Sequence, residues 1–239
     1  VTVNHILGLK AVMPSGEVVQ FGGRTEVTSG YDLTGILVGS EGTFCIVTEV
    51  IVRLIKNPQT QRTFLAVFDS VDDASTAVSK IIAAGIIPAA LELIDNLVIE
   101  AVESHLKAGF PLDAAAILLI EIDGNESVLE DEADRIQTVC SASGAVDFQQ
   151  AQSEEERQML WRGRKEAIGA VGRITPAFYT NDGVVPRSKL PQILQFDLET
   201  GEKFGLRVAH LCHAGDGNIH PIILYDPDDP TQVDAAVKT

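Results

Sequence analysis

The first 57 residues carry apolar positions in short runs that are separated by turn signals. ILGLKAVM and EVVQFGG flank Pro14-Ser15-Gly16, which predicts two strands joined by a tight turn. A Gly-Ser-Glu-Gly loop then precedes IVTEVIVRLI, a long run rich in β-branched residues. The Ile-Lys-Asn-Pro segment at 55–58 has the composition of a linker. We therefore expect a β-rich part over residues 1–57 and a boundary near residue 58.

From residue 61 the hydrophobic period switches between that of strands and that of helices. RTFLAVF predicts a strand, and Ser70 with Asp73 forms a capping box at the start of a helix. Gly85 suits the end of that helix. The helix has apolar residues at helical spacing, which are Ala74, Ala77, Val78, Ile81 and Ile82. PAALELI, NLVIEAVESHL, AAAILLIEID, a third helix and AVDFQQA follow, so the order is β-α-β-α-β-α-β. This order indicates an α+β or α/β sandwich and suits a ferredoxin-like substrate (cap) domain over residues 58–239.

The last third of the chain contains two more predicted helices and a strand pair. EEERQMLWRGRKEAIGAVG predicts a helix over 154–172, and its acidic start suits a helix N-terminus. A helix is also predicted near 188–199, before two strands around HLCHAGDGNIHP. The chain begins without Met inside a predicted strand and ends inside the first turn of a predicted helix. We interpret it as a fragment of a longer protein.

Composition narrows the class of protein. The 239 residues have a formal net charge of −16 and a pI near 4.6, which argues against nucleic acid and anionic membranes as partners. The three cysteines show no CxxC spacing, as expected in a reducing compartment. The longest apolar run, AAAILLI, is far shorter than the roughly 20 residues of a membrane span. We expect a cytoplasmic protein without direct membrane insertion.

HLCHAGDGNIHP contains three of the five histidines of the chain. Asp216-Gly217 is a strong signal for a two-residue hairpin turn. A turn centred there places His213 directly opposite His220, with Cβ atoms roughly 4.5–5.5 Å apart. Two such imidazoles could share a metal ion, or flank a substrate as acid and base. Strand alternation puts His210 on the other face, so it is not assigned to the site.

An arginine lies on an apolar stripe of the helix predicted over 154–172. Trp161, Arg164, Ile168 and Val171 are spaced three, four and three residues apart and share one face. Such an arginine can form a salt bridge at the edge of the stripe, or its guanidinium can bind a substrate carboxylate through two hydrogen bonds. The spacing leaves both interpretations open.

The Gly39-Ser40-Glu41-Gly42-Thr43 loop also has two interpretations. It can be an ordinary tight β-turn, or its exposed N–H groups can form an anion-binding concavity. YDLTGILVGSEGTFCIVTEVIVRL resembles the closing segment of the FAD-binding domain of the vanillyl-alcohol oxidase/PCMH superfamily. There the run usually reads Gly-Ser-Glu-Gly-Thr-Leu-Gly-Ile, whereas this chain has Phe44 and Cys45 in place of Leu-Gly. The resemblance implies FAD contacts at Glu41, Gly42, Thr43, Ile46 and Val47.

Three further segments, WRGRKEA, YTNDGVVPRSKLP and HAGDGNIHP, resemble the C-terminal FAD-linked oxidase domain in the branch that holds the flavin-bearing glycolate oxidase and D-lactate dehydrogenase chains. The resemblance implies that Arg164 and Asn218 bind the substrate. It implies that His213 and His220 lie over the flavin and bind a divalent metal in some members, either Zn, Mn or Fe. The third ligand of that pattern is a Glu in a downstream Gly-Glu-His-Gly segment, which this chain does not include. Asp182 and Arg187 fall in the second matching segment.

The implied function is that of an FAD-dependent 2-hydroxy-acid dehydrogenase or oxidase, with hydride transfer from glycolate or D-lactate to the flavin. The catalytic residues would be His213, His220 and Arg164. The resemblance also implies electron-transfer partner subunits, and through them a possible peripheral membrane location. Residues 1–57 would be the C-terminal part of a PCMH-type FAD-binding domain, and 58–239 the FAD-linked oxidase C-terminal domain. Two alternatives stay open, namely a metal-dependent hydrolase built on the His213/His220 pair and a non-catalytic α+β module that binds a small molecule.

Overall fold

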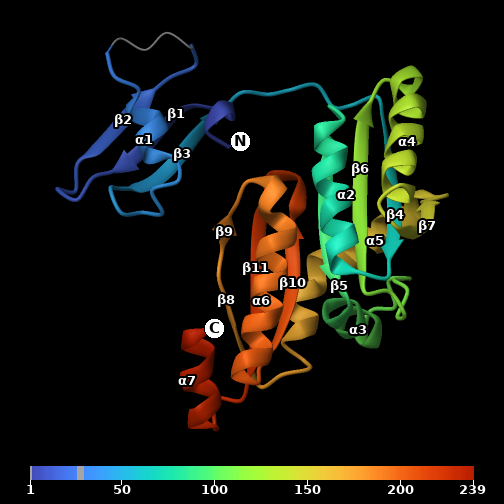
Figure 1. Ribbon diagram of the computed structural model, residues 1–239. Coiled ribbons are helices and arrows are strands. Elements are labelled where there is room, and N and C mark those ends of the chain that lie inside the picture. Colours follow the sequence, from blue (N-terminus) through green and yellow to red (C-terminus); the bar gives the residue numbers. More distant parts are fainter. Residues whose placement is uncertain (1, 26–29) are drawn as a thin grey trace. The chain divides into compact units, whose positions relative to one another are not determined.

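A computed structural model describes residues 2–25 and 30–239 of the chain, which divides into the units Val1–Asn57 and Pro58–Thr239 (Figure 1). The first unit contains η1 (Thr2–His5), β1 (Ile6–Val12), β2 (Val18–Gly22), α1 (Leu33–Leu37) and β3 (Ile46–Val52). Its antiparallel sheet has the order β2-β1-β3. The predicted strand–turn–strand at Pro14-Ser15-Gly16 is confirmed, and Gly16 has a φ of 83°. The sequence did not predict α1, whose N-cap residue Asp32 accepts a hydrogen bond from the Gly35 amide.

The first half of the second unit follows the predicted order of strands and helices. Its elements are β4 (Thr60–Phe68), α2 (Val71–Ala83), β5 (Ala90–Asp95), α3 (Asn96–His105), β6 (Ala116–Gly124), α4 (Glu126–Ser141) and β7 (Ala145–Gln150). The Ser70 hydroxyl accepts from the Asp73 amide at the start of α2, and Gly85 has a φ of 77° after its end. The strands pair antiparallel in the order β7-β4-β6-β5, so the α+β, ferredoxin-like prediction is confirmed.

The rest of the chain extends this sheet beyond β5. The added elements are α5 (Glu154–Val171), β8 (Ala177–Thr180), β9 (Gly183–Val184), η2 (Arg187–Lys189), α6 (Leu190–Phe204), β10 (Arg207–His213), η3 (Ala214–Asp216), β11 (Asn218–Tyr225) and α7 (Pro230–Lys238). β10 pairs with β5, β11 with β10, and both β8 and β9 with β11. Figure 1 shows α6 in front of β10 and β11.

Helices cover both faces of this sheet. On one face the apolar residues of α2, α4 and α6 pack against one set of strand residues, such as Leu118, Ile120 and Cys212. On the other face α3 and α5 pack against the alternate set, such as Ile117, Leu119 and Leu211. This division follows from the two-residue period of strands. It determines which polar side chains of β5, β10 and β11 lie on the side of α5.

In the part of the chain that the structure describes, no helix combines the length and the apolar character needed to cross a bilayer.

Candidate functional site

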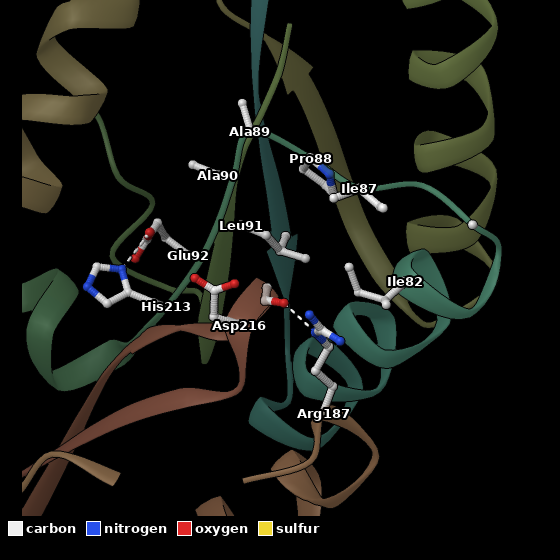
Figure 2. Close-up of a pocket in the computed structure, with 12 residues that line it drawn as sticks. Ile82, Ile87, Pro88, Ala89, Ala90, Leu91, Glu92, Arg187, His213 and Asp216 are labelled. Atoms are coloured by element: carbon white, nitrogen blue, oxygen red, sulfur yellow. Dashed lines mark hydrogen bonds and ion pairs between the residues drawn. The ribbon is translucent and has the colours of Figure 1, made fainter. Parts of the chain in front are cut away.

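Glu92 of β5 and His213 of β10 form a pair across two neighbouring strands. The register Leu211–Ile94 and Cys212–Leu93, continued by one residue, brings His213 opposite Glu92. His213 Nδ1 lies 2.8 Å from Glu92 Oε1 (Figure 2). The Glu92 side chain is 8% exposed and that of His213 is 49% exposed. The buried Glu92 carboxylate therefore holds the Nδ1 edge of the His213 ring, and the other edge of the ring is exposed.

Arg164 joins this pair from α5. Its Nε donates to Glu92 Oε2 at 2.8 Å, and its Nη2 lies 3.4 Å from His213 Nδ1. The Arg164 side chain is only 11% exposed. The salt-bridge interpretation of the stripe is confirmed, because Arg164 pairs with Glu92. Nε forms the salt bridge, while Nη1 donates no hydrogen bond within residues 2–25 and 30–239.

His213 and His220 lie on one face, but the predicted register is wrong. His213 pairs with Asn218, and His220 pairs with Leu211, so the two histidines are diagonal neighbours. The prediction assumed a two-residue turn, whereas η3 and Gly217 together take four residues out of the ladder. The rings still meet edge to face, with centroids 5.3 Å apart and an interplanar angle of 85°. Diagonal neighbours on a sheet face are within reach of ring side chains.

His220 also has an acidic neighbour. Its Nδ1 lies 3.5 Å from Oδ1 of Asp182, which is in the bend between β8 and β9. Burial lowers the pKa of His220 below its ordinary value, although the charge of Asp182 opposes this shift. His220 is therefore a neutral imidazole near neutral pH, and a neutral imidazole can accept a proton.

Asn218 and Arg187 lie at the turn beside the two histidines. Asn218 begins β11 opposite His213, and its Oδ1 atom is buried without a hydrogen-bond partner in the described structure. Arg187 Nε donates to the carbonyl of Gly215 and so holds the turn. The Val185 amide donates to the Gly217 carbonyl at 2.9 Å, which fixes the other end of the same turn.

A cavity of about 410 Å³ opens next to Glu92 and His213. Its wall is mainly apolar and includes Ile82, Ile87, Pro88 and Leu91, with Arg187 and Asp216 at the turn (Figure 2). A concave, largely apolar pocket with a few convergent polar groups is the usual form of a small-molecule site.

His210 lies on the opposite face, as the alternation predicts. It is fully buried, with Nδ1 3.3 Å from Asp95 Oδ2 and Nε2 3.4 Å from Asp197 Oδ2. Burial lowers the pKa of His210, but Asp197 and Asp95 outweigh this effect and raise it to about 9. His210 is therefore a buried cation between two carboxylates, away from the cluster of Arg164, Glu92 and His213.

The two site histidines do not form a complete metal site with the residues that the structure describes. Among those residues, no group of three or more His, Cys, Asp and Glu side chains could hold a metal ion. Two imidazoles alone are too few ligands for the three or four that protein zinc sites provide.

The Gly-Ser-Glu-Gly-Thr loop is exposed and strained. Glu41 has a φ of 51° and Gly42 a φ of 78°, and their amides donate no hydrogen bond within the described residues. Thr43 closes the loop by donating from its hydroxyl to the Ser40 carbonyl at 2.6 Å. Ile46 and Val47 follow with 62% and 40% exposed surface. Free amides in a left-handed loop can bind anionic groups, so Glu41 and Gly42 fit an FAD contact.

Cys45, which stands where the resembled family usually has glycine, does not obstruct that exposed surface. Its side chain is 4% exposed and packs in the small core of the first unit with Leu9, Ala11 and Leu37. The substitution therefore fills the core and leaves the neighbouring loop open.

Glu92, the residue that connects the cluster, was not predicted from the sequence. A signal was present, because Glu92 interrupts the apolar strand PAALELI at a position whose neighbours Leu91 and Leu93 face the other core. A carboxylate inside an apolar strand must find a partner when it is buried. The partner itself could not be read from the sequence, since Arg164 and His213 lie far along the chain.

Comparisons with known proteins agree with this architecture. The family described as "FAD linked oxidases, C-terminal domain" matches residues 57–239. The chain is 44% identical over 229 residues to the "Glycolate oxidase subunit GlcD" of Escherichia coli strain K12, covering 96% of this chain and 46% of that protein. It is 32% identical over 232 residues to "D-lactate dehydrogenase [cytochrome], mitochondrial" of Arabidopsis thaliana, with 96% and 41% covered. The chain thus spans about half the length of these curated relatives or less.

Solved structures share the fold at low identity. A crystal structure of p-cresol methylhydroxylase with substrate bound matches with a TM-score of 0.72 and 13% identity, over 98% of this chain and 54% of that one. The 4-ethylphenol oxidase from Gulosibacter chungangensis matches with a TM-score of 0.71 and 16% identity, over the same shares.

Proposed function

The chain belongs to the family of FAD-linked oxidases, and on that premise we propose that its parent protein is an FAD-dependent 2-hydroxy-acid dehydrogenase or oxidase. The observation that carries the proposal is the cluster of Arg164, Glu92 and His213, with His220 in ring contact. Glu92 and His213 also line a largely apolar cavity. The cluster brings together a cationic side chain that can bind a carboxylate and imidazoles that can accept a proton.

Arg164 is proposed to bind the carboxylate of the substrate. Its Nε is occupied by Glu92 and its Nη2 lies 3.4 Å from His213 Nδ1, so Nη1 is the group left for a ligand. Because the side chain is held at 11% exposure, little conformational entropy is lost when a carboxylate binds. A charge-assisted hydrogen bond in such a place is stronger than one in water. Asn218, whose Oδ1 atom is buried without a hydrogen-bond partner in the described structure, is proposed to contact the substrate.

The histidine pair is proposed to take the hydroxyl proton. Oxidation of a 2-hydroxy acid to a 2-oxo acid removes a hydride from the α-carbon and a proton from the hydroxyl. His213 and His220 lie on one face with ring contact, and His220 has a lowered pKa that keeps it neutral. A neutral imidazole within hydrogen-bond reach of the hydroxyl is a suitable general base.

FAD, when bound, supplies the two-electron acceptor for the α-hydride. Contacts to it are proposed for Glu41, Gly42, Thr43, Ile46 and Val47. Glu41 and Gly42 have free amides in the exposed loop, and the side chains of Ile46 and Val47 are exposed at the start of β3. We propose that residues 1–57 are the C-terminal part of a PCMH-type FAD-binding domain, and that 58–239 are the FAD-linked oxidase C-terminal domain.

Glycolate and D-lactate are the proposed substrates, since the names of the relatives describe a glycolate oxidase subunit and a D-lactate dehydrogenase. The word "subunit" in the first name also supports electron-transfer partner subunits. We propose a cytoplasmic protein that reaches the membrane only through such partners.

The test is dye reduction by the purified full-length protein with glycolate, D-lactate and D-2-hydroxyglutarate. Turnover with one of these acids in a flavin-containing preparation supports the proposal. Metal-dependent hydrolysis without flavin would instead favour a hydrolase, and tight binding of a hydroxy acid without flavin or turnover would favour a binding module.

A further inference from the structure

We propose that Glu92 is a positioning residue that fixes the tautomer of His213 and the direction of the Arg164 guanidinium. The inference rests on the proposed function of the site. It goes beyond that function because it assigns a role to a strand residue that contacts two of the proposed catalytic side chains rather than the substrate.

Glu92 divides its two oxygens between two partners. Oε1 lies 2.8 Å from His213 Nδ1, and Oε2 accepts from Arg164 Nε at 2.8 Å. The carboxylate is 8% exposed, so it loses most of its hydration and depends on these two partners for compensation. It has no other hydrogen bond in the described structure, and in particular none to the backbone.

The neighbouring pair on the same two strands shows a different arrangement. Asp95 and His210 also lie opposite each other by the register of β5 and β10. Asp95, however, accepts from two backbone amides, that of Val98 at 3.1 Å and that of His210 at 2.6 Å. Asp95 therefore caps α3 and supports the strands, whereas Glu92 bonds only side chains at the site. This difference points to a functional role for Glu92.

The tautomer follows from hydrogen-bond chemistry. A carboxylate only accepts hydrogen bonds, so the hydrogen of the short Glu92 contact must be on His213 Nδ1. The longer contact of 3.4 Å from Arg164 Nη2 to the same nitrogen does not compete with it. In the neutral ring, Nε2 then carries the lone pair. His213 thus offers Nε2 as the proton acceptor on its exposed edge.

Replacing Glu92 by glutamine should invert this tautomer. Glutamine has one acceptor oxygen and one donor NH₂ group. Arg164 can only donate, so it takes the oxygen, and the NH₂ group then faces His213 Nδ1. His213 Nδ1 must become the acceptor, which moves the ring hydrogen to Nε2, so that Nε2 of His213 can no longer accept a proton. Glu92→Asp keeps the charge and the acceptor pair and should restore the original tautomer in part.

The experiment compares E92Q, E92D and E121Q in the full-length protein. Glu121 of β6 is a matched control because it also holds α5, accepting from Trp161 Nε1 at 2.8 Å and from Arg157 Nη1 at 3.1 Å. It does not contact Arg164 or His213. Nitrogen-15 NMR of histidine-labelled protein reports the tautomer, and the absence of a signal in His213→Gln assigns it. Steady-state kinetics with the preferred hydroxy acid report kcat and KM.

We expect His213 to carry its ring hydrogen on Nδ1 in the wild type and on Nε2 in E92Q. We expect kcat to be about 10- to 100-fold lower in E92Q than in the wild type. E92D should recover part of the loss, and E121Q should keep the wild-type kcat within about twofold. An unchanged tautomer in E92Q, or an equal kcat loss in E92Q and E121Q, would overturn the positioning role. The NMR result is independent of turnover, so an inactive wild-type protein would count against the proposed function and leave the tautomer question answered.

Discussion

The imidazole rings of His213 and His220 meet edge to face with centroids 5.3 Å apart, although the two residues are not opposite each other in the β10–β11 ladder. The four-residue turn between the strands creates this diagonal contact. Its geometry depends on Gly217, which has a φ of 74° and lies against the Val185 carbonyl.

Gly217→Ala should disrupt this turn. A Cβ at that position would lie 2.1 Å from the Val185 oxygen, and the positive φ is strained for alanine. We expect a loss of about 2–4 kcal/mol in the free energy of unfolding, together with most of the activity. Urea denaturation measures the free energy of unfolding. Gly205→Ala is the matched control, because Gly205 has a φ of 69° but no atom within 4 Å of its Cβ position. Equal losses in both variants would show that close approach at Gly217 is unimportant.

Arg164→Lys should weaken substrate binding although it keeps the positive charge. An ammonium group cannot donate to Glu92 and bind a carboxylate with the fork geometry of a guanidinium. We expect kcat/KM to fall about 10- to 100-fold, which corresponds to the loss of one charge-assisted hydrogen bond. Arg162→Lys is the control, since Arg162 is 56% exposed and, among the residues that the structure describes, pairs only with Glu166. If Arg164→Lys has the same kcat/KM as the control, Arg164 does not bind the substrate.

The buried His210 predicts a pH-dependent stability. Its pKa is about 9 in the folded chain and about 6.5 in the unfolded chain, so the folded state binds more protons between these values. The stabilisation from Asp95 and Asp197 is therefore complete below pH 6.5 and is lost as the pH rises through about 9. The loss is on the order of 3 kcal/mol. Denaturation between these pH values should show a slope in the wild type that His210→Gln lacks, and equal slopes would contradict the prediction.

Gly42→Ala should reduce flavin retention by the full-length protein. Gly42 has a φ of 78° in the exposed loop that is proposed to contact FAD, and alanine would shift the free amides of that loop. Gly16→Ala is the control, because Gly16 has a φ of 83° in the β1–β2 turn with open space around it. We expect the purified Gly42→Ala protein to have less flavin per chain than Gly16→Ala. The same flavin content in both variants would exclude the loop from the FAD site.

Local patterns predicted the strands and helices because each carries its own periodicity and end signals, as Ser70 and Gly85 do for α2. The face shared by His213 and His220 was predicted from a hairpin turn at Asp216-Gly217, because residues seven apart on one straight strand would lie on opposite faces. The register was not predictable, because Asp216-Gly217 fits a two-residue turn as well as the longer turn that includes η3. The bond between Glu92 and Arg164 depends on how α5 packs on the sheet, and no local signal encodes that contact.

The full-length protein is proposed to oxidise a 2-hydroxy acid by transferring its α-hydrogen to bound flavin. Anaerobic rapid mixing of that protein with glycolate or D-lactate, each with and without deuterium on the α-carbon, tests it directly. We predict that the visible absorbance of the flavin disappears within the time of one turnover, and that deuterium slows this step severalfold. A full-length protein without flavin, or a flavin that stays oxidised with both acids, would contradict the account.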